Sequence, residues 1–281
     1  MDQGQELIKL ALFGQPIKSS LSPFIQRMFA AQFGLNIEFQ RIETGAGGFP
    51  RALEKFRRHG GVGCNVTLPL KRDAWQLASG ASPAVIQAQA ANTLIYKPAT
   101  GWFAHNTDGA GLIADLIGNH GIDLAGQRLL LLGAGGAAAG VLGPLLQAGP
   151  REVVLVNRNL ERAEMLSARF EGGGKINVTN WADLHTLGSF NVVINATSLG
   201  HQGEAPPLPA SVFAPAAVCY DLNYYKASLP LKALCENRGC AYIDGLGMLV
   251  EQAAKSFFIW SGKRPDSSLV TTACRTRELT G

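Results

Sequence analysis

Residues 128–141, RLLLLGAGGAAAGV, have the types and spacing of a loop that binds a dinucleotide. The glycine pattern is Gly133-x-Gly135-x-x-Ala138, and it lies between an apolar run of strand length and the start of a helix. Gly133 allows a tight turn, Gly135 lets the backbone approach a pyrophosphate, and Ala138 permits close packing of helix on strand. The N–H groups of the helix that begins near Gly136 favour phosphate binding. We therefore expect a bound dinucleotide here rather than a packing turn without a ligand.

The end of the next predicted strand indicates which dinucleotide binds. NAD enzymes place a carboxylate there, about 20 residues after the glycine loop, to bind the ribose hydroxyl. In this chain the strand EVVLV is followed by Asn157, Arg158 and Asn159, with no carboxylate. Arg158 presents a fork of donors that suits a phosphate, and Arg162 follows one helical turn later. Because basic residues at a helix start oppose the helix dipole, a ligand explains them better than solvation alone, and NADP is favoured over NAD.

Two charged residues of the first half, Lys71 and Asp108, also occupy positions where chemistry is possible. Lys71 ends the segment NVTLPLK, which places it just past a strand, at the sheet edge where α/β proteins bind ligands. Asp108 lies in NTDG at the start of a predicted helix. Taken singly, Lys71 would be explained as a solvated surface lysine, and Asp108 as a carboxylate at the start of a helix.

The elements that would position these residues alternate between strands and helices, as in α/β proteins. Strands are predicted at Leu7–Phe13, Ile37–Ile42, Val62–Thr67, Thr93–Tyr96, Gly101–Ala104, Leu129–Leu132, Glu152–Val156, Ile176–Val178, Val192–Asn195 and Val218–Leu222. Helices are predicted from Pro23 to Phe33 with Ser22 as the cap, and at Pro50–Arg58, Lys71–Ala78, Pro83–Ala90, Asp108–Ile117, Gly136–Gln147, Leu160–Phe170, Leu229–Arg238, Met248–Trp260 and Ser267–Leu279. A domain boundary is expected near residues 105–107, where a fresh strand–loop–helix unit follows.

Composition excludes several classes of protein. The 281 residues are 47% hydrophobic, enough for one or two cores, and the net charge of +4 is too mild for a nucleic-acid binder. Five cysteines without a CxxC pair argue against a disulfide framework or a zinc site, so no metal is expected. The N-terminal segment MDQGQELIKL lacks the features of a signal peptide. The segment between Arg128 and Arg151 has no charge, but its glycines and Pro144 argue against a membrane-spanning helix. We expect a cytoplasmic protein without a membrane partner.

Eight segments, taken together and in this order, resemble the shikimate dehydrogenase family. They are GQPIKSSLSPFIQ (14–26), NVTLPLK (65–71), ANTL (91–94), NTDGAGL (106–112), GAGGAAAGV (133–141), VNR (156–158), INATSLG (194–200) and DGLGMLVEQAA (244–254). The resemblance covers essentially the whole chain, and NVTxPxK, NTDG and DGLGMLxxQ are its most specific parts.

The resemblance implies two α/β domains. A catalytic, substrate-binding domain would span 1–106, a Rossmann domain 107–245, and C-terminal helices, 246–281, would return to the first domain. The implied activity is the reversible reduction of 3-dehydroshikimate to shikimate by NADPH in aromatic amino-acid biosynthesis.

By motif position, the resemblance implies that Lys71 and Asp108 form the catalytic pair. Ser20 and Ser22 would hold the substrate carboxylate, and further substrate contacts would come from Thr67, Asn92, Tyr224 and Gln252. The implied cofactor-binding residues are Gly133, Ala134, Gly135, Gly136, Ala137, Asn157, Arg158, Arg162, Thr197 and Gly245. The residue types fit, because hydride addition to a ketone needs a proton donor, and either member of the pair could carry that proton.

The chain departs from the family after GAGG, where Ala138 and Ala139 stand in place of a hydroxyl residue and an arginine. This departure predicts weaker cofactor binding. One alternative is a paralogue of the same fold that uses quinate or an aminoshikimate. Another is a catalytically silent NADP-binding regulatory module, although Lys71, Asp108 and Gln252 together argue against it. The protein is expected to be a monomer or a homodimer.

Overall fold

The computed structural model describes residues 7–280, which form two compact units. The first unit comprises the described residues up to Gly111 together with those from Val250 onward, and the second comprises Leu112–Leu249. The chain therefore crosses between the units inside two helices, α5 (Asp108–Ile113) and α9 (Leu246–Ser261). The C-terminal segment belongs with the N-terminal unit.

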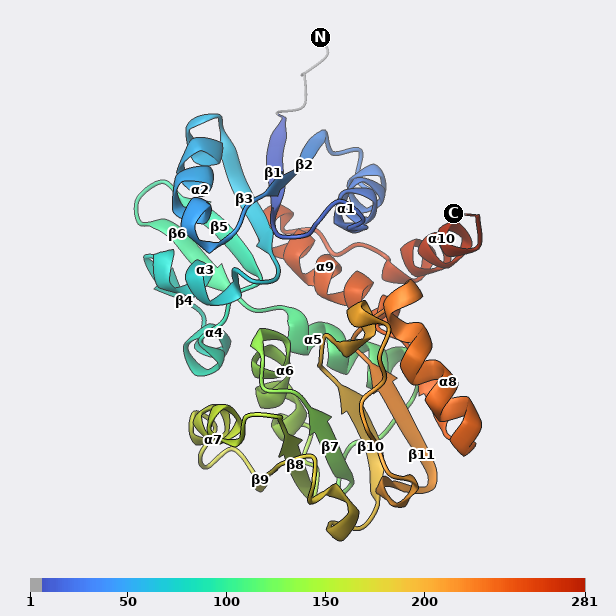
Figure 1. Ribbon diagram of the computed structural model, residues 1–281. Helices are drawn as coiled ribbons and strands as arrows, with labels where there is room; N and C mark the ends of the chain where they lie inside the picture. The colour runs from blue at the N-terminus through green and yellow to red at the C-terminus, as the bar shows by residue number, and fades with distance from the viewer. Residues whose placement is uncertain (1–6, 281) are drawn as a thin grey trace. The chain divides into compact units, whose positions relative to one another are not determined.

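The first unit is built on a mixed six-stranded sheet in the order β2-β1-β3-β5-β6-β4 (Figure 1). Strands β1, β2 and β3 are parallel, whereas β5 is antiparallel to both β3 and β6. Besides parts of α5 and α9, its elements are β1 (Ile8–Gly14), α1 (Ser22–Ala31), β2 (Ile37–Glu43), α2 (Phe49–Arg58), β3 (Gly61–Val66), α3 (Lys71–Leu77), β4 (Gly80–Ala81), α4 (Pro83–Ala88), β5 (Thr93–Lys97), β6 (Gly101–His105) and α10 (Ser267–Thr280).

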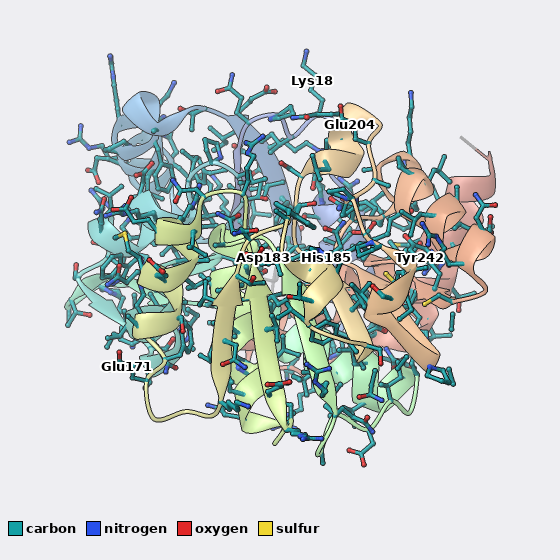
Figure 2. The ribbon with its side chains drawn as sticks, turned by 60° about the horizontal axis from the view of Figure 1, so that its bottom comes forward. Lys18, Glu171, Asp183, His185, Glu204 and Tyr242 are labelled. Atoms are coloured by element: carbon teal, nitrogen blue, oxygen red, sulfur yellow. The ribbon has the colours of Figure 1, made fainter. Side chains whose placement is uncertain are left out.

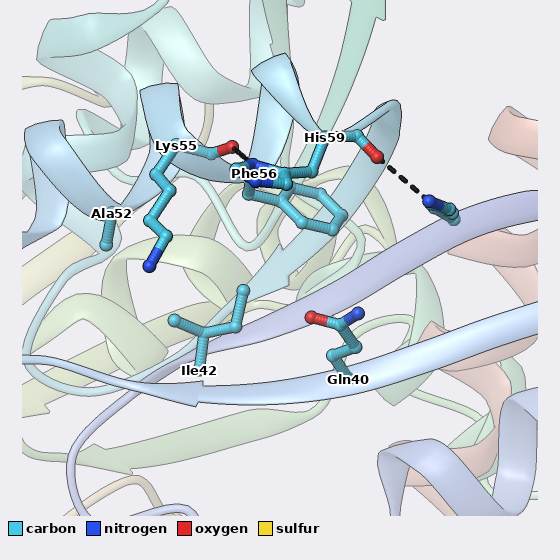
Figure 3. A pocket seen from close by; sticks show the side chains of 7 residues that line it. Gln40, Ile42, Ala52, Lys55, Phe56 and His59 are labelled. Atoms are coloured by element: carbon cyan, nitrogen blue, oxygen red, sulfur yellow. Dashed lines mark hydrogen bonds between the residues drawn. The ribbon is translucent and has the colours of Figure 1, made fainter.

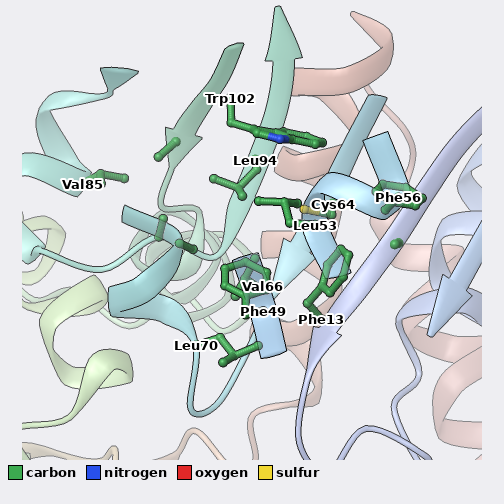
Figure 4. Close-up of a cluster of buried hydrophobic side chains, with 14 residues drawn as sticks. Phe13, Phe49, Leu53, Phe56, Cys64, Val66, Leu70, Val85, Leu94 and Trp102 are labelled. Atoms are coloured by element: carbon green, nitrogen blue, oxygen red, sulfur yellow. The ribbon is translucent and has the colours of Figure 1, made fainter. Parts of the chain in front are cut away.

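Strand β1 is apolar from Leu10 to Phe13, where both of its faces are buried. Ala11 and Phe13 point into a cluster of buried side chains that includes residues of α2, α3 and α4 (Figure 4). In that cluster the rings of Phe13 and Phe49 meet edge to face, with centroids 5.4 Å apart. Leu10 and Leu12 belong to the cluster on the opposite face. This alternation fixes the register of the strand that leads into the loop carrying Ser20 and Ser22.

Aromatic side chains hold helix α9 in the first unit. The ring of Phe257 packs against that of Phe29 in α1, with centroids 5.7 Å apart. Trp260 packs against Phe39 of β2, and its indole Nε1 donates a 3.0 Å hydrogen bond to the carbonyl of Leu94 in β5. Trp260 lies in α9, and its partners Phe39 and Leu94 lie in strands of the sheet. These contacts therefore hold the preceding turns of α9 at fixed positions against the sheet.

The second unit contains a parallel six-stranded sheet in the order β12-β11-β10-β7-β8-β9. This order is that of a doubly wound dinucleotide-binding fold, and its direction reverses between β7 and β10. The elements are β7 (Arg128–Leu132), α6 (Gly136–Gln147), β8 (Glu152–Val156), α7 (Leu160–Ala168), β9 (Ile176–Thr179), β10 (Phe190–Asn195), β11 (Phe213–Asp221), α8 (Leu229–Arg238) and β12 (Ala241–Ile243). The prediction of two α/β domains, one of them of the Rossmann type, is confirmed.

The structure corrects several local predictions. Ser22 does not cap α1: it is the first helical residue, and Leu21 takes the N-cap position without a side-chain hydrogen bond. The helix predicted as Asp108–Ile117 changes after Ile113 to a π-helical turn, Ala114–Asn119. The two- and three-residue strands β4 and β12 were missed because such short segments show no period.

Charged side chains such as Lys18, Glu171 and Glu204 lie on the exterior (Figure 2). The charge-free segment before Arg151 forms β7, the glycine loop and α6. Among residues 7–280, no helix combines the length and the apolar character needed to span a membrane. All five cysteines are free, and Cys240 alone among them is not buried.

Candidate active site and cofactor loop

Lys71 and Asp108 meet in the first unit. Lys71 is the first residue of α3, just after the strand β3, and Asp108 is the first residue of α5. The Lys71 ammonium forms a short hydrogen-bonded ion pair with Oδ2 of Asp108. Their side chains are 14% and 8% exposed, so the pair is largely shielded from water yet accessible at one side. The structure thus brings together the two residues that sequence motifs predicted as a pair.

Asn92 and Gln252, both predicted to contact substrate, lie next to this pair. The side-chain amide of Asn92 donates to Oδ1 of Asp108 at 2.8 Å and lies 3.2 Å from Oε1 of Gln252. Asn92 is 3% exposed, so these hydrogen bonds are protected from competition with water. The side chains of Asn92 just before β5, Asp108 in α5 and Gln252 in α9 therefore lie close together.

A buried polar layer that sequence reasoning missed lies behind them. Its members are Asn65, Thr93, Thr107 and Ser256, all at most 5% exposed. The backbone N–H of Thr107 donates to Oδ1 of Asn92, and the Asn92 amide donates back to the Thr107 hydroxyl, both at 2.8 Å. Thr107 and Asn65 lie inside the motifs NTDG and NVTLPLK, so the motifs could have pointed to them. For Ser256 the sequence offers only one signal, its spacing of one helical turn from Gln252.

The hydroxyls of Ser20, on the loop after β1, and Ser22, the first residue of α1, lie together. Their oxygens are 3.2 Å apart, and the backbone N–H of Ser22 donates to the Ser20 hydroxyl at 3.2 Å. Arg41 of β2 donates to the Ser20 carbonyl at 2.6 Å, which fixes the loop. Thr67 follows β3, and its backbone N–H donates to the carbonyl of Phe13 at the end of β1. The structure therefore fixes the backbone around all three hydroxyl residues.

The glycine loop of the second unit has the form that a pyrophosphate requires. Gly133 has a φ of +101°, a conformation that residues with a Cβ rarely adopt, and it lies against Thr197. Gly135 is the N-cap of α6, has no side-chain cap, and has open space where a Cβ would lie. Ala134, Gly136 and Ala137 complete the loop and the first turn of α6. The uncapped N–H groups and the space above them fit a dinucleotide phosphate.

Polar residues follow β8, where the adenosine ribose of a dinucleotide binds in this fold. Asn159 caps α7 by accepting a 2.9 Å hydrogen bond from the backbone N–H of Arg162. The Arg162 side chain donates through Nε to the carbonyl of Ala134 in the glycine loop at 3.0 Å. The amide of Asn157 donates to the carbonyl of Asn159 at 2.8 Å. Arg158 is exposed and forms no ion pair with the described residues, so its guanidinium is available to an anion.

A second polar network holds the loops at the ends of β10 and β11. Oδ1 of Asn195 accepts hydrogen bonds from both the backbone and the hydroxyl of Thr197, while its amide donates to Asp221 at 2.9 Å. Asn223 donates to the same Asp221 oxygen and to the carbonyl of Thr197. Burial raises the pKa of the Asp221 carboxyl to about 6, although these hydrogen bonds oppose the shift.

Gly245 and Tyr224 also lie in the second unit. A Cβ on Gly245 would overlap the carbonyl of Leu222, so this position requires glycine for close packing beside the end of β11. The Gly245 N–H donates to the carbonyl of Asn223 at 2.9 Å. Tyr224 follows β11 and packs its ring edge to face against Tyr225, with centroids 5.3 Å apart.

A separate cavity of about 520 Å³ lies between α2 and strands β1 and β2 (Figure 3). Lys9, Ile42, Lys55 and Phe56 are among its lining residues, and none of the predicted site residues lines it. Within residues 7–280, no group of three or more His, Cys, Asp or Glu side chains could hold a metal ion.

Three family models match the chain in succession. The model described as shikimate dehydrogenase substrate binding domain matches residues 12–94, and shikimate / quinate 5-dehydrogenase matches residues 114–202. The shikimate 5'-dehydrogenase C-terminal domain matches residues 245–275.

Similar proteins match over nearly their whole length. A curated shikimate dehydrogenase (NADP(+)) from Alkalilimnicola ehrlichii is 46% identical over 95% of this chain and 98% of its own. The crystal structure of an Ael1 enzyme from Pseudomonas putida is 38% identical, with a TM-score of 0.87 over 95% of this chain and 97% of its own. Shikimate 5-dehydrogenase from Thermus thermophilus, solved in complex with NADP(H) and shikimate, is 30% identical, with a TM-score of 0.83 over 96% and 99% of the two chains.

Proposed function

Because this chain belongs to the shikimate dehydrogenase family, we infer that it catalyses the reversible NADPH-dependent reduction of 3-dehydroshikimate to shikimate. The observation that carries this inference is the ion pair of Lys71 and Asp108 with Asn92 on the second carboxylate oxygen. This reaction belongs to aromatic amino-acid biosynthesis, and the enzyme is an oxidoreductase.

Lys71 is the proton carrier in this proposal. Asp108 accepts hydrogen bonds at both oxygens, from the Lys71 ammonium and from the Asn92 amide, and so serves in this proposal to hold Lys71. The ammonium of Lys71 has further protons to donate beyond the one directed at Asp108. Bound NADPH supplies the hydride to the ketone carbon, and Lys71 gives a proton to the ketone oxygen. Asp108 holds the ammonium in place.

Hydroxyl and amide side chains bind the rest of the substrate. Ser20, on the loop after β1, and Ser22, at the start of α1, donate to its carboxylate, and their two hydroxyls are 3.2 Å apart. Its ring hydroxyls are bound by Thr67, Asn92, Tyr224 and Gln252. A site that pairs each hydroxyl discriminates strongly against analogues that lack one, because a buried donor or acceptor is then left unpaired.

The cofactor is NADP. The pyrophosphate binds the loop of residues 133–137, and Thr197 and Gly245 border the same edge of the sheet. Arg158 and Asn157 bind the 2′-phosphate, and Arg162 supports it from the first turn of α7 while its Nε holds the glycine loop. Ala138 and Ala139 are 0% and 5% exposed, so they pack α6 on the sheet and offer no phosphate contact.

A panel of substrates with both cofactors tests this function. We expect NADP⁺-dependent oxidation of shikimate, followed by the absorbance of the NADPH formed, with quinate turned over far more slowly. Faster turnover of quinate than of shikimate would identify a paralogue of the same fold. No turnover of either, with NADP⁺ still bound, would identify a binding module.

We further propose that the protein is cytoplasmic and is a monomer or a homodimer that needs no nucleic-acid or membrane partner. Fractionation of cells that express a tagged chain and light scattering of the purified protein test these two statements separately.

A further inference from the structure

The hydroxyl of Ser256 lies at the centre of the polar layer behind the catalytic pair. Ser256 is 0% exposed and lies one turn after Gln252 in α9. Its oxygen is 3.1 Å from the amide nitrogen of Asn65 in β3, 2.7 Å from the Thr93 hydroxyl in β5 and 3.2 Å from the Thr107 hydroxyl before α5. It is also 3.0 Å from the carbonyl of Gln252. One atom thus joins four segments of the first unit.

Counting protons fixes the direction of these hydrogen bonds. A serine hydroxyl has one proton to donate and two lone pairs that accept. A backbone carbonyl can only accept a hydrogen bond, and a side-chain amide nitrogen can only donate one. Ser256 therefore donates to the Gln252 carbonyl and accepts from the Asn65 amide. One lone pair remains, and the Thr93 hydroxyl at 2.7 Å is the closer donor for it.

This direction determines what the Thr107 hydroxyl does. The two amide protons of Asn92 are directed to Asp108 and to the Thr107 oxygen, each at 2.8 Å. The Thr107 proton then has two acceptors, Oδ1 of Asn92 at 3.2 Å and Oε1 of Gln252 at 3.3 Å. Thr107 therefore links Asn92 to the side-chain oxygen of Gln252, while the backbone carbonyl of Gln252 accepts from Ser256.

We infer that Ser256 is a positioning residue for this reaction: its hydroxyl orients Asn92 and Gln252, and through Asn92 the carboxylate of Asp108. This inference rests on the proposed function. Without the Ser256 oxygen, the Thr93 hydroxyl can donate to Oδ1 of Asn92, 3.0 Å away, where the Thr107 backbone N–H already donates. The amide of Asn92 would then be pulled from its position on Asp108.

The test compares Ser256→Ala with Ser261→Ala. Ser261 is the matched control, because it makes the same bond to the carbonyl four residues earlier in α9, at 2.8 Å, and does not touch the polar layer. We expect Ser256→Ala to lower kcat for shikimate about tenfold, since small misplacements of reacting groups are costly, and to leave the KM for NADP⁺ within about twofold. Ser261→Ala should keep the wild-type kcat.

A double mutant separates positioning from general stability. If Ser256 acts through Asn92, then Ser256→Ala should cost less than about threefold in an Asn92→Ala background, because coupled residues are not additive. The inference is overturned if the two substitutions lower kcat by fully additive amounts. It is also overturned if Ser256→Ala keeps the wild-type kcat and lowers only the Tm. Should Ser256→Ala fail to fold, the double variant Ser256→Ala with Thr93→Val removes the redirected donor as well and should keep kcat within about threefold of the wild type, whereas a tenfold loss there overturns the inference. A wild-type chain inactive on shikimate would refute the proposed function instead.

Discussion

The side-chain amide of Asn92 donates a 2.8 Å hydrogen bond to Oδ1 of Asp108, the carboxylate oxygen that Lys71 leaves open. The carboxylate is therefore held from two directions, by a cation and by a neutral amide that is itself fixed through Thr107. Such a carboxylate cannot rotate freely, so it aims the Lys71 ammonium. In the proposed mechanism this arrangement separates two roles: Asp108 holds Lys71, and Lys71 carries the proton.

Replacing Lys71 by alanine should reduce turnover by roughly 10²–10⁴-fold, the range for loss of a general acid or base. The core should survive, because Lys71 lies at the first position of α3 and contributes no apolar side chain to the cluster around Phe13. Steady-state kinetics with circular dichroism measure both effects. Lys55→Ala, on the exposed face of α2, is the control. Near-normal turnover in Lys71→Ala would remove this residue from the mechanism.

Sequence patterns predicted the elements that carry a strong period or a punctuating residue. The apolar run of β7 and the glycines after it allow few other structures, so the loop at Gly133 was predicted at the right residues. Ser22 was wrongly predicted as a helix cap because a serine before a proline suits that role, whereas the fold uses its hydroxyl with Ser20. Local sequence could not reveal that choice.

The polar layer could not be predicted from the sequence, because it depends on contacts between distant segments. Ser256 and Asn65 are 191 residues apart, and their contact depends on α9 returning to the first unit and packing against its sheet. A serine inside an amphipathic helix has many ordinary explanations, so its type alone indicates nothing. The pairing of Lys71 with Asp108 could be predicted because each residue lies in a distinctive motif, whereas the residues that support them are defined by tertiary packing.

The Ser20 hydroxyl is expected to bind the substrate carboxylate. Ser20→Ala should raise the KM for shikimate about tenfold, the loss expected for one hydrogen bond to a charged group, with kcat less affected. Stability should change little, because the lost intramolecular bond from the Ser22 N–H is long, at 3.2 Å, and only part-buried. Ser19→Ala, at the exposed neighbouring position, is the control. Equal KM values in the two variants would place Ser20 outside the site.

Stability should depend on pH through Asp221. Its pKa of about 6 in the folded protein exceeds the ordinary value of 3.8, so the folded state binds the proton more tightly. The stabilisation is present in full below about pH 4 and is lost as pH rises through about 6, a change of at most about 3 kcal/mol. Asp221→Asn keeps an oxygen to accept from Asn195 and Asn223 and does not titrate.

Urea unfolding of wild type and Asp221→Asn at several pH values checks this sign. The variant should gain stability over the wild type between about pH 4 and 6 and keep that advantage at higher pH. Asp123→Asn, at an exposed site, controls for the loss of one negative charge. A wild type that becomes relatively more stable than Asp221→Asn as pH rises would contradict the burial argument.

Arg158 should determine the choice between NADP and NAD. It follows β8 at the point where NAD enzymes place a carboxylate, it is exposed, and Asn157 beside it is already oriented by the carbonyl of Asn159. A phosphate there accepts charge-assisted hydrogen bonds of about 1.5–3 kcal/mol each, which corresponds to a preference of more than about tenfold. Arg158→Ala should therefore raise the KM for NADP⁺ strongly and leave that for NAD⁺ almost unchanged. Arg162 retains part of the preference, since its guanidinium lies one turn along α7.

Side-by-side KM values for NADP⁺ and NAD⁺, in wild type and Arg158→Ala, decide the matter. The wild-type preference should shrink as salt concentration rises, because part of it is a Coulombic attraction that ions screen. Arg151→Ala, at an exposed position before β8, removes one positive charge from the same unit without touching the ribose site and should leave the preference intact. If the wild type uses NAD⁺ and NADP⁺ equally well, Arg158 does not bind the 2′-phosphate, and the residues after β8 must be assigned to the adenosine ribose alone.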